Sequence, residues 1–248
     1  MKITFLGTSH GVPDTDRYCQ SILIETGDSA YLVDAGAPVI DLLTRKGFDL
    51  KKIRAVFITH MHGDHIDGLL SFVDLSMWYY KEVSYDIYVT EEEGIPCFKN
   101  MLNMIHRNSM TFPDERLRFK LVDENFCYDD GNVIVKAVPT NHLSCCNRPA
   151  YGYVIEDKDK KIYVSGDLCA DNIDYNDIAD REELDAFMVE SAHFEGARLI
   201  EKLKSCIAKK VMIIHGYRDE IADDFAEFEK TDIAFELIYP SDGDEYIV

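Results

Sequence analysis

Long apolar runs are missing from this 248-residue chain, and no stretch reaches the roughly eighteen apolar residues that a membrane-spanning helix needs. Residues 1–6 predict a β-strand and do not have the pattern of a signal peptide. Repeats, low-complexity stretches and linkers are also absent, and 46% of the residues are apolar. We therefore expect one soluble, cytoplasmic domain that spans residues 1–248 and has no membrane partner.

Paired cysteine motifs are absent as well. The seven cysteines are an odd number and show no CxxC spacing, as is typical of free thiols in a reducing compartment. We expect no disulfides. The vicinal pair Cys145-Cys146 is expected to shape the wall of a site and not to bind a metal.

Basic residues are scarce, with 26 Lys and Arg against 46 Asp and Glu, and the formal net charge is −20. Residues 51–54 and 209–210 hold the short basic clusters, and neither forms a strip. A protein of this charge repels long polyanions unless a local basic strip overrides the field. The composition therefore favours a small-molecule substrate over nucleic acid.

Histidine is also rare, yet three of the eight histidines lie in one six-residue segment, His60-Met61-His62-Gly63-Asp64-His65. This segment follows the strand-like run Ala55–Thr59. A polar turn is the alternative reading, but it does not explain the crowding. Imidazole and carboxylate are ligands that Zn²⁺, Mn²⁺ and Fe²⁺ share, and the segment contains no thiolate. The pattern predicts an open, catalytic metal site.

Three more candidate ligands each follow a predicted strand. His142 follows residues 135–140, Asp167 follows residues 161–164, and His215 follows residues 210–214. A single residue of this kind is usually a turn residue or a cap. Together with the histidine cluster they indicate one site, because strands of α/β proteins place ligands on the loops that follow them.

At this point the sequence resembles the metallo-β-lactamase-fold hydrolase superfamily, whose HxHxDH motif is matched in full by the segment from His60 to His65. The resemblance implies two divalent ions, Zn²⁺ or Mn²⁺ ahead of Fe²⁺, and a hydrolytic reaction by a water that the ions activate. One ion would be held by His60, His62 and His142. The other would be held by Asp64, His65 and His215, and Asp167 would bridge the two.

The secondary-structure pattern predicts an α/β protein with two mixed sheets packed face to face and helices on the outer faces. The resemblance supplies its name, a four-layer αβ/βα sandwich. Strands are expected at residues 2–6, 20–26, 30–34, 53–59, 86–90, 117–122, 132–138, 150–156, 161–165, 184–190, 210–214 and 235–239. Helices are expected at residues 38–46, 66–80, 91–106, 171–181, 194–209 and 219–230.

The loop Gly7–Pro13 is similar to the first loop of the ribonuclease Z and cyclic-phosphodiesterase branch of the superfamily. In this interpretation Arg17 contacts a phosphate; otherwise it is an exposed loop residue. The chain departs from the ribonuclease Z pattern at Val33–Pro38 and at Asp67–Leu70, and no Gly-Pro-rich arm is evident. We therefore expect a small cyclic phosphodiester, such as a cyclic nucleotide or a ribose cyclic phosphate.

Within that branch a helper histidine stands near the leaving group, and His193 fits its place. We expect Asp64 and His193 to be catalytic, with His193 as a general acid that Glu190 orients. The alternative is a histidine that only caps a helix or positions a ligand carboxylate.

Residues 91–115 are the least family-like part of the chain. Met101, Leu102, Met104 and Ile105 predict the buried face of a helix. Alternatively the segment caps the pocket or forms a homodimer contact, with His106 or Arg107 reaching the substrate phosphate.

Other functions stay open at this stage. One is a ribonuclease Z-like tRNA 3′-processing endonuclease, and another is a lactonase, thioesterase or β-lactamase-like hydrolase. A redox member of the superfamily is less favoured, because His62 stands where such proteins tend to have Glu. A binding module without catalysis would be expected to have lost ligands, and none is missing here.

Overall fold

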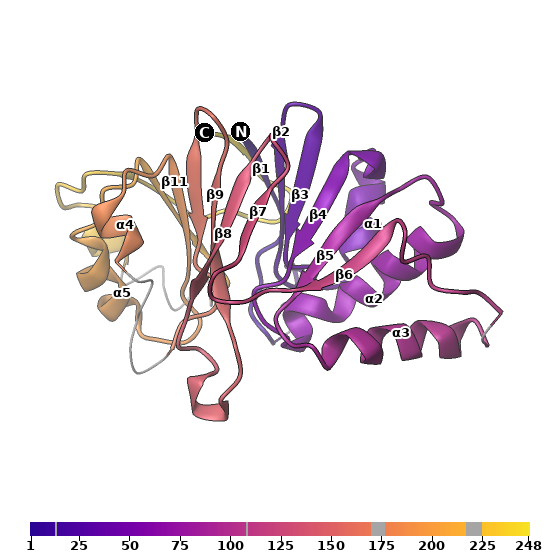
Figure 1. Cartoon of the computed structure of the whole chain (residues 1–248). Helices are drawn as coiled ribbons and strands as arrows, with labels where there is room; N and C mark the ends of the chain where they lie inside the picture. The colour runs from indigo at the N-terminus through magenta and orange to yellow at the C-terminus, as the bar shows by residue number, and fades with distance from the viewer. Residues whose placement is uncertain (13, 108, 170–176, 217–224) are drawn as a thin grey trace.

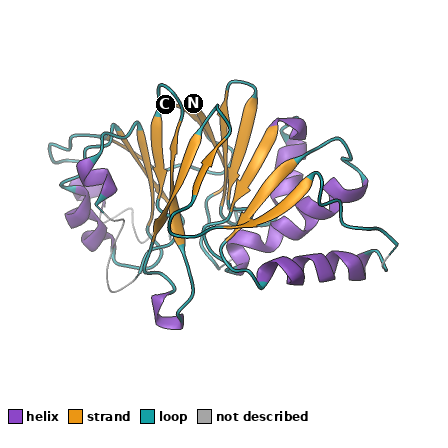
Figure 2. Cartoon of the chain, in the orientation of Figure 1, coloured by secondary structure: helices purple, strands orange, loops and turns teal. Residues whose placement is uncertain are grey.

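The computed structural model describes residues 1–12, 14–107, 109–169, 177–216 and 225–248. Two seven-stranded sheets face each other in it, and helices cover the outer face of each (Figures 1 and 2). The predicted four-layer αβ/βα sandwich is confirmed.

The first sheet has the strand order β14-β1-β2-β3-β4-β5-β6 and belongs mostly to the first half of the chain. Helices α1 (Val39–Arg45), α2 (Gly63–Trp78) and α3 (Gly94–Ile105) lie on its outer side. Its strands are β1 (Lys2–Gly7), β2 (Ser21–Thr26), β3 (Ser29–Val33), β4 (Ile53–Phe57), β5 (Tyr85–Val89), β6 (Leu117–Leu121) and β14 (Glu245–Ile247), with the 3₁₀ turn η1 (Leu50–Lys52) before β4.

The second sheet has the order β13-β12-β11-β10-β9-β8-β7. Helices α4 (Ile178–Arg181) and α5 (Gly196–Leu203) lie on its outer side. Its strands are β7 (Cys127–Asp129), β8 (Ile134–Pro139), β9 (Tyr151–Glu156), β10 (Lys161–Val164), β11 (Ala186–Glu190), β12 (Lys210–Ile214) and β13 (Glu236–Ile238), with the 3₁₀ turn η2 (Ser144–Cys146) between β8 and β9.

Both sheets change from antiparallel to parallel pairing part-way across. Pairing is parallel from β3 to β6 in the first sheet and from β10 to β13 in the second. The carboxyl ends of parallel strands meet at one edge of a sheet, and loops there carry functional groups. The seven candidate metal ligands and His193 lie in the segments that follow β4, β8, β10, β11 and β12.

Three apolar layers hold the sandwich together, one between the sheets and one under each helical face. In β3, Tyr31 and Val33 pack between the sheets, whereas Ala30 and Leu32 pack against the helices. This division follows from the two-residue period of a strand. Because β3 is apolar on both faces, it is buried along its whole length.

The predicted elements differ from the structure mainly at edges and ends. The short edge strands β7 and β14 were not predicted, because each pairs with one neighbour only and buries too little to leave an apolar pattern. Helix α2 begins at residue 63, three residues earlier than expected, and α3 and α5 are shorter than expected. Parts of the helices expected at 171–181 and 219–230 lie outside the described residues, as do Pro13 and Asn108.

Within the described ranges, no helix is both long and apolar enough to cross a membrane. All seven cysteines are free thiols, as predicted.

Candidate metal centre

The histidine cluster forms the connection from β4 into helix α2. His60 is fully buried, His62 is the residue before the helix, and Asp64 and His65 lie in its first turn. Two glycines let the loop after β3 pack directly on this turn: a Cβ atom on Gly68 would lie 2.5 Å from the carbonyl oxygen of Gly36. The backbone of α2, and with it the cluster, is therefore held against the first sheet.

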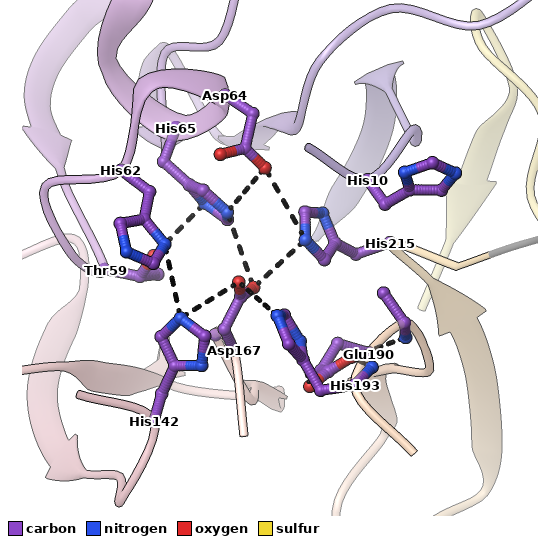
Figure 3. Close-up of polar contacts among 12 residues, drawn as sticks. His10, Thr59, His62, Asp64, His65, His142, Asp167, Glu190, His193 and His215 are labelled. Atoms are coloured by element: carbon purple, nitrogen blue, oxygen red, sulfur yellow. Dashed lines mark hydrogen bonds and ion pairs between the residues drawn. The ribbon is translucent and has the colours of Figure 1, made fainter. Parts of the chain in front are cut away.

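The three distant candidates converge on this cluster, as the sequence predicts (Figure 3). His142 follows β8, Asp167 follows β10, and His215 follows β12. The nitrogen and oxygen atoms then form two groups, each within 4.8 Å, namely His60, His62, His142 and Asp167 in the first group and Asp64, His65 and His215 in the second.

Asp167 lies between the two groups and turns one carboxylate oxygen toward each. Its Oδ2 atom is 3.5 Å from His60 Nε2 and 3.6 Å from His142 Nε2. Its Oδ1 atom is 3.4 Å from both His65 Nε2 and His215 Nε2. If each group held an ion, Asp167 would bridge the two, the role that the resemblance implies.

The buried nitrogens of the cluster fit a metal. The Nε2 atoms of His60 and His65 are buried, and neither has a hydrogen-bond partner in the described part of the chain. Unpartnered polar atoms are costly inside a protein, and a metal ion would satisfy both of these. The donor set of imidazole nitrogen and carboxylate oxygen suits Zn²⁺, Mn²⁺ or Fe²⁺.

Burial keeps the three imidazoles of the first group neutral. It lowers the pKa of His60 and His62, and it lowers the pKa of His142 to about 4. A metal can therefore bind these nitrogens at neutral pH without displacing a proton.

His65 is held differently, by a buried carboxylate that the sequence analysis did not identify. Asp34, directly after β3, lies 2.8 Å from His65 Nδ1 and accepts hydrogen bonds from Thr59 N and Oγ1. Burial would lower the pKa of His65, but the carboxylates of Asp167 and Asp34 raise it well above its usual value. With Nδ1 donating to Asp34, Nε2 faces Asp64 and Asp167.

The backbone of Asp34 is in the left-handed region, with φ of 60°, which non-glycine residues adopt infrequently. His215 is similar, with φ of 46°. Backbone strain of this kind collects at functional sites. The sequence contains one hint of Asp34, an acidic residue directly after the apolar run Ala30–Val33.

His193 also stands beside the metal ligands. Its Nε2 atom is 3.9 Å from Asp167 Oδ2, and its Nδ1 atom is 2.9 Å from Glu190 Oε1 (Figure 3). Glu190 is buried and also accepts hydrogen bonds from the backbone nitrogens of Leu168 and Ala192. Burial would lower the pKa of His193, but the Glu190 carboxylate raises it to about 9.

His106 and Arg17, which were considered as contacts of the substrate phosphate, pair with carboxylates instead. His106 Nε2 lies 2.6 Å from Asp74 Oδ1, in the second half of α2, so it fastens α3 to α2 and does not face the metal ligands. Arg17 pairs with Asp14 within its own loop. The same first loop contacts the site, because Thr8 O accepts a hydrogen bond from His215 N at 3.1 Å.

Comparison with protein-family models decides the family. The model described as anti-Pycsar protein Apyc1 matches residues 1–236. The chain belongs to the Apyc1 family.

Relatives of this Apyc1-family chain include ribonuclease Z of Cyanothece sp. (strain PCC 7425 / ATCC 29141). The two are 33% identical over 162 residues, which cover 64% of this chain and 48% of that protein. The chain therefore spans about half the length of the curated relatives it matches.

Solved structures support the same fold. YhfI from Bacillus subtilis, a metallo-β-lactamase-fold protein, has a TM-score of 0.77 and 18% identity, with 99% of both chains covered. The short form of human tRNase Z has a TM-score of 0.72 and 21% identity, with 100% of this chain and 99% of that chain covered. The predicted fold and the ribonuclease Z and phosphodiesterase branch are confirmed.

Proposed function

We propose that this Apyc1-family chain is a dinuclear metal-dependent phosphodiesterase that hydrolyses a small cyclic phosphodiester, such as a cyclic nucleotide or a ribose cyclic phosphate. The observation that carries the proposal is the Asp167 carboxylate, which turns one oxygen toward each ligand group, with His193 beside it.

In the proposed site, His60, His62 and His142 would hold one ion, and Asp64, His65 and His215 would hold the other, with Asp167 turned toward both groups. The ions would be Zn²⁺ or Mn²⁺. When bound, such a pair supplies a nucleophilic water at neutral pH and positive charge for the phosphate oxygens.

His193 supplies the proton that the leaving group needs. As the bond between phosphorus and the leaving oxygen breaks, the Nε2 proton passes to that oxygen, and Glu190 holds the ring from the Nδ1 side. A general acid of this kind typically contributes about 10²- to 10⁴-fold in rate. The pKa of His193, raised to about 9, keeps the ring protonated at neutral pH.

The charge of the chain supports a small substrate. The formal net charge of −20 disfavours long polyanions. Hydrolysis of RNA is the second candidate, and one observation favours it: the curated relative from Cyanothece sp. is named ribonuclease Z.

A substrate panel separates these candidates. The purified protein is incubated with Mn²⁺ or Zn²⁺ and with bis-p-nitrophenyl phosphate, cyclic nucleotides, 3′-extended tRNA and a lactone. We expect hydrolysis of the first two classes. Activity restricted to the lactone would overturn the phosphodiesterase proposal, and tRNA cleavage that persists at low enzyme concentration would favour the second candidate. Elemental analysis of protein prepared without added metal identifies the ions.

We further propose that residues 91–115 form a homodimer contact. Of the four residues predicted to form the buried face of a helix, Leu102 is buried, but Met101, Met104 and Ile105 are 43%, 65% and 47% exposed, so the prediction is wrong for these three. A partner subunit that covered this apolar group would remove it from water. Light scattering should give a dimer mass, and Met104→Glu should shift it toward the monomer. A monomeric wild-type protein would exclude this contact.

A further inference from the structure

Two adjacent thiols are exposed on the loop that follows the candidate metal ligand His142. Cys145 and Cys146 lie in the 3₁₀ turn η2, which projects below the sheets in the view of Figure 1. Their Sγ atoms are 3.5 Å apart. Redox-sensing cysteines are typically accessible to solvent and lie next to a second cysteine that resolves the oxidised form. Neither the metal centre nor the proposed reaction uses this pair.

A disulfide between neighbouring residues is strained and easily reduced. The Cα atoms of adjacent residues are about 3.8 Å apart across a trans peptide bond, whereas about 4.4–6.8 Å is usual across a disulfide. Strained or exposed disulfides are the labile, regulatory ones, because they are reduced more readily than structural disulfides. The pair Cys145-Cys146 is therefore suited to reversible oxidation and not to holding the fold together.

The turn is hydrogen-bonded to the residues on both sides of His142. Ser144 donates to the Asn141 carbonyl oxygen from its backbone nitrogen at 3.1 Å and from its hydroxyl at 2.8 Å. The backbone nitrogen of Cys146 donates to the Leu143 carbonyl oxygen at 3.0 Å. This N–H belongs to the peptide group between the two cysteines, which a disulfide encloses in a small ring. Closing that ring requires new backbone angles at this peptide, so we expect the hydrogen bond to Leu143 to be lost.

The position of the His142 imidazole depends on the path of this loop. Its Nδ1 atom donates to the Leu168 carbonyl oxygen at 3.2 Å, so its Nε2 atom faces His62 and Asp167. Because Leu143 directly follows His142, a shift of the Leu143 backbone moves the imidazole. Changes to the groups that orient a metal ligand typically alter metal affinity about 10- to 100-fold.

We propose that Cys145 and Cys146 form a reversible disulfide that weakens metal binding in the ligand group that contains His142. The inference deepens the proposed function, because it concerns the regulation of the same site. Its effect on turnover rests on that function, whereas the disulfide and the loss of metal do not. In a reducing compartment the thiols stay free and the site keeps its full affinity, and oxidising conditions lower that affinity.

The redox step is a thiol–disulfide exchange with a small disulfide such as glutathione disulfide. The neighbouring sulfur raises the pKa of the Cys145 thiol, so we expect Cys146 to react first. The Cys146 thiolate attacks one sulfur of the oxidant, and one glutathione leaves. Cys145 then loses its proton and attacks the Cys146 sulfur, and the second glutathione leaves. The cysteine pair is oxidised by two electrons, and the oxidant is reduced to two glutathione molecules, which take up the two protons.

The test follows the disulfide and metal retention in the same samples. The full chain is loaded with Zn²⁺, treated with excess glutathione disulfide or kept reduced, and equilibrated with a series of chelator concentrations. After alkylation, mass spectrometry should show Cys145 linked to Cys146 in a peptide that has lost two hydrogen atoms. Elemental analysis should show that the oxidised protein binds metal about tenfold more weakly or less, as for other changes around a metal ligand. Dithiothreitol should restore the affinity.

The matched variant is Cys145→Ser combined with Cys146→Ser, because serine is close to cysteine in shape and forms no disulfide. Cys145→Ala combined with Cys146→Ala is a second version in case the serines disturb the turn. Each variant is compared with its own reduced sample, and oxidant should leave its metal retention unchanged. Cys127→Ser removes another exposed thiol, on the edge strand β7, and should respond to oxidant as the wild type does.

The inference is overturned if excess glutathione disulfide links Cys145 and Cys146 in no sample. It is also overturned if the disulfide forms and metal retention stays unchanged, or if the double variants lose as much metal as the wild type. Turnover of bis-p-nitrophenyl phosphate separates the inference from the proposed function. If the reduced protein hydrolyses this probe and oxidation changes neither metal retention nor turnover, the switch is wrong and the phosphodiesterase stands. If oxidation releases metal but the reduced protein hydrolyses no phosphodiester, the proposed function fails and the switch stands.

Discussion

Asp34 and Glu190 are two buried carboxylates that each hold a histidine, one in each half of the sandwich. Each is 1% exposed and lies beside the Nδ1 atom of its partner, at 2.8 Å from His65 and 2.9 Å from His193. In both pairs burial would lower the pKa of the imidazole, and the carboxylate helps to raise it. The two pairs therefore have nearly the same local geometry and the same effect on the pKa of the imidazole.

The imidazoles of His65 and His193 differ in their surroundings. The side chain of His65 is 1% exposed, and its Nε2 atom is enclosed by Asp64 and Asp167. The side chain of His193 is 32% exposed, and its Nε2 atom reaches Asp167 only at 3.9 Å. A histidine held by a buried carboxylate therefore suits the role of a metal ligand when its ring is enclosed. It suits the role of a proton donor when a substrate can reach the ring.

Asp167 faces both groups of candidate metal ligands, so its replacement should have the largest effect on metal binding and turnover. Asp167→Asn removes the charge that faces both ligand groups. We expect loss of at least one bound ion and a fall in turnover of about 10⁴-fold or more, as for other central catalytic groups. Elemental analysis and phosphodiester turnover measure this. Two retained ions with near wild-type turnover would exclude the bridging role.

His193→Ala should have the next largest effect, and only on the chemical step. We expect turnover of a substrate with a poor leaving group to fall about 10²- to 10⁴-fold. Turnover of bis-p-nitrophenyl phosphate should fall much less, because p-nitrophenolate leaves without a proton. Metal content should stay at the wild-type value. Equal losses on both substrates would show that His193 is not the acid.

Asp34→Asn tests the enclosed pair. The neutral amide of the variant removes the negative charge beside His65 Nδ1. We therefore expect metal affinity to fall about 10- to 100-fold. Excess metal should restore turnover. The measurement is a metal titration followed by calorimetry or activity. Unchanged affinity would mean that Asp34 serves only to hold the loop at Thr59.

Glu190→Gln tests the exposed pair and should have the smallest effect. The Glu190 carboxylate offsets the effect of burial, which lowers the pKa of His193. Without this carboxylate the pKa of His193 falls from about 9. The protonated form is the active one and is lost as pH rises through that pKa. The alkaline limb of the pH–rate profile for a poor leaving group should therefore move to lower pH. Metal affinity should not change, in contrast to Asp34→Asn.

Much of the site was predicted from the sequence for a physical reason. The residues from His60 to His65 are neighbours along the chain, so their crowding is visible without a fold. His142, Asp167 and His215 were predicted because each ends an apolar strand, and strands of a parallel sheet carry such residues to one edge. The two sheets and most helices were predicted from apolar periodicity in the same way.

Asp34 could not be predicted as the support of His65, because the two residues are 31 positions apart and meet only when β3 packs beside α2. His106 was considered for the substrate because it lies in residues 91–115, the least family-like part of the chain. The packing of α3 instead brings it to Asp74.

The sequence determines which ligand types are present and that several follow strands, since these depend on composition and local periodicity. Tertiary structure alone decides that Asp167 turns one oxygen toward each group. It also decides that His65 is enclosed while His193 is partly open. Those features depend on how separate loops pack at one sheet edge, and residue spacing does not encode that packing.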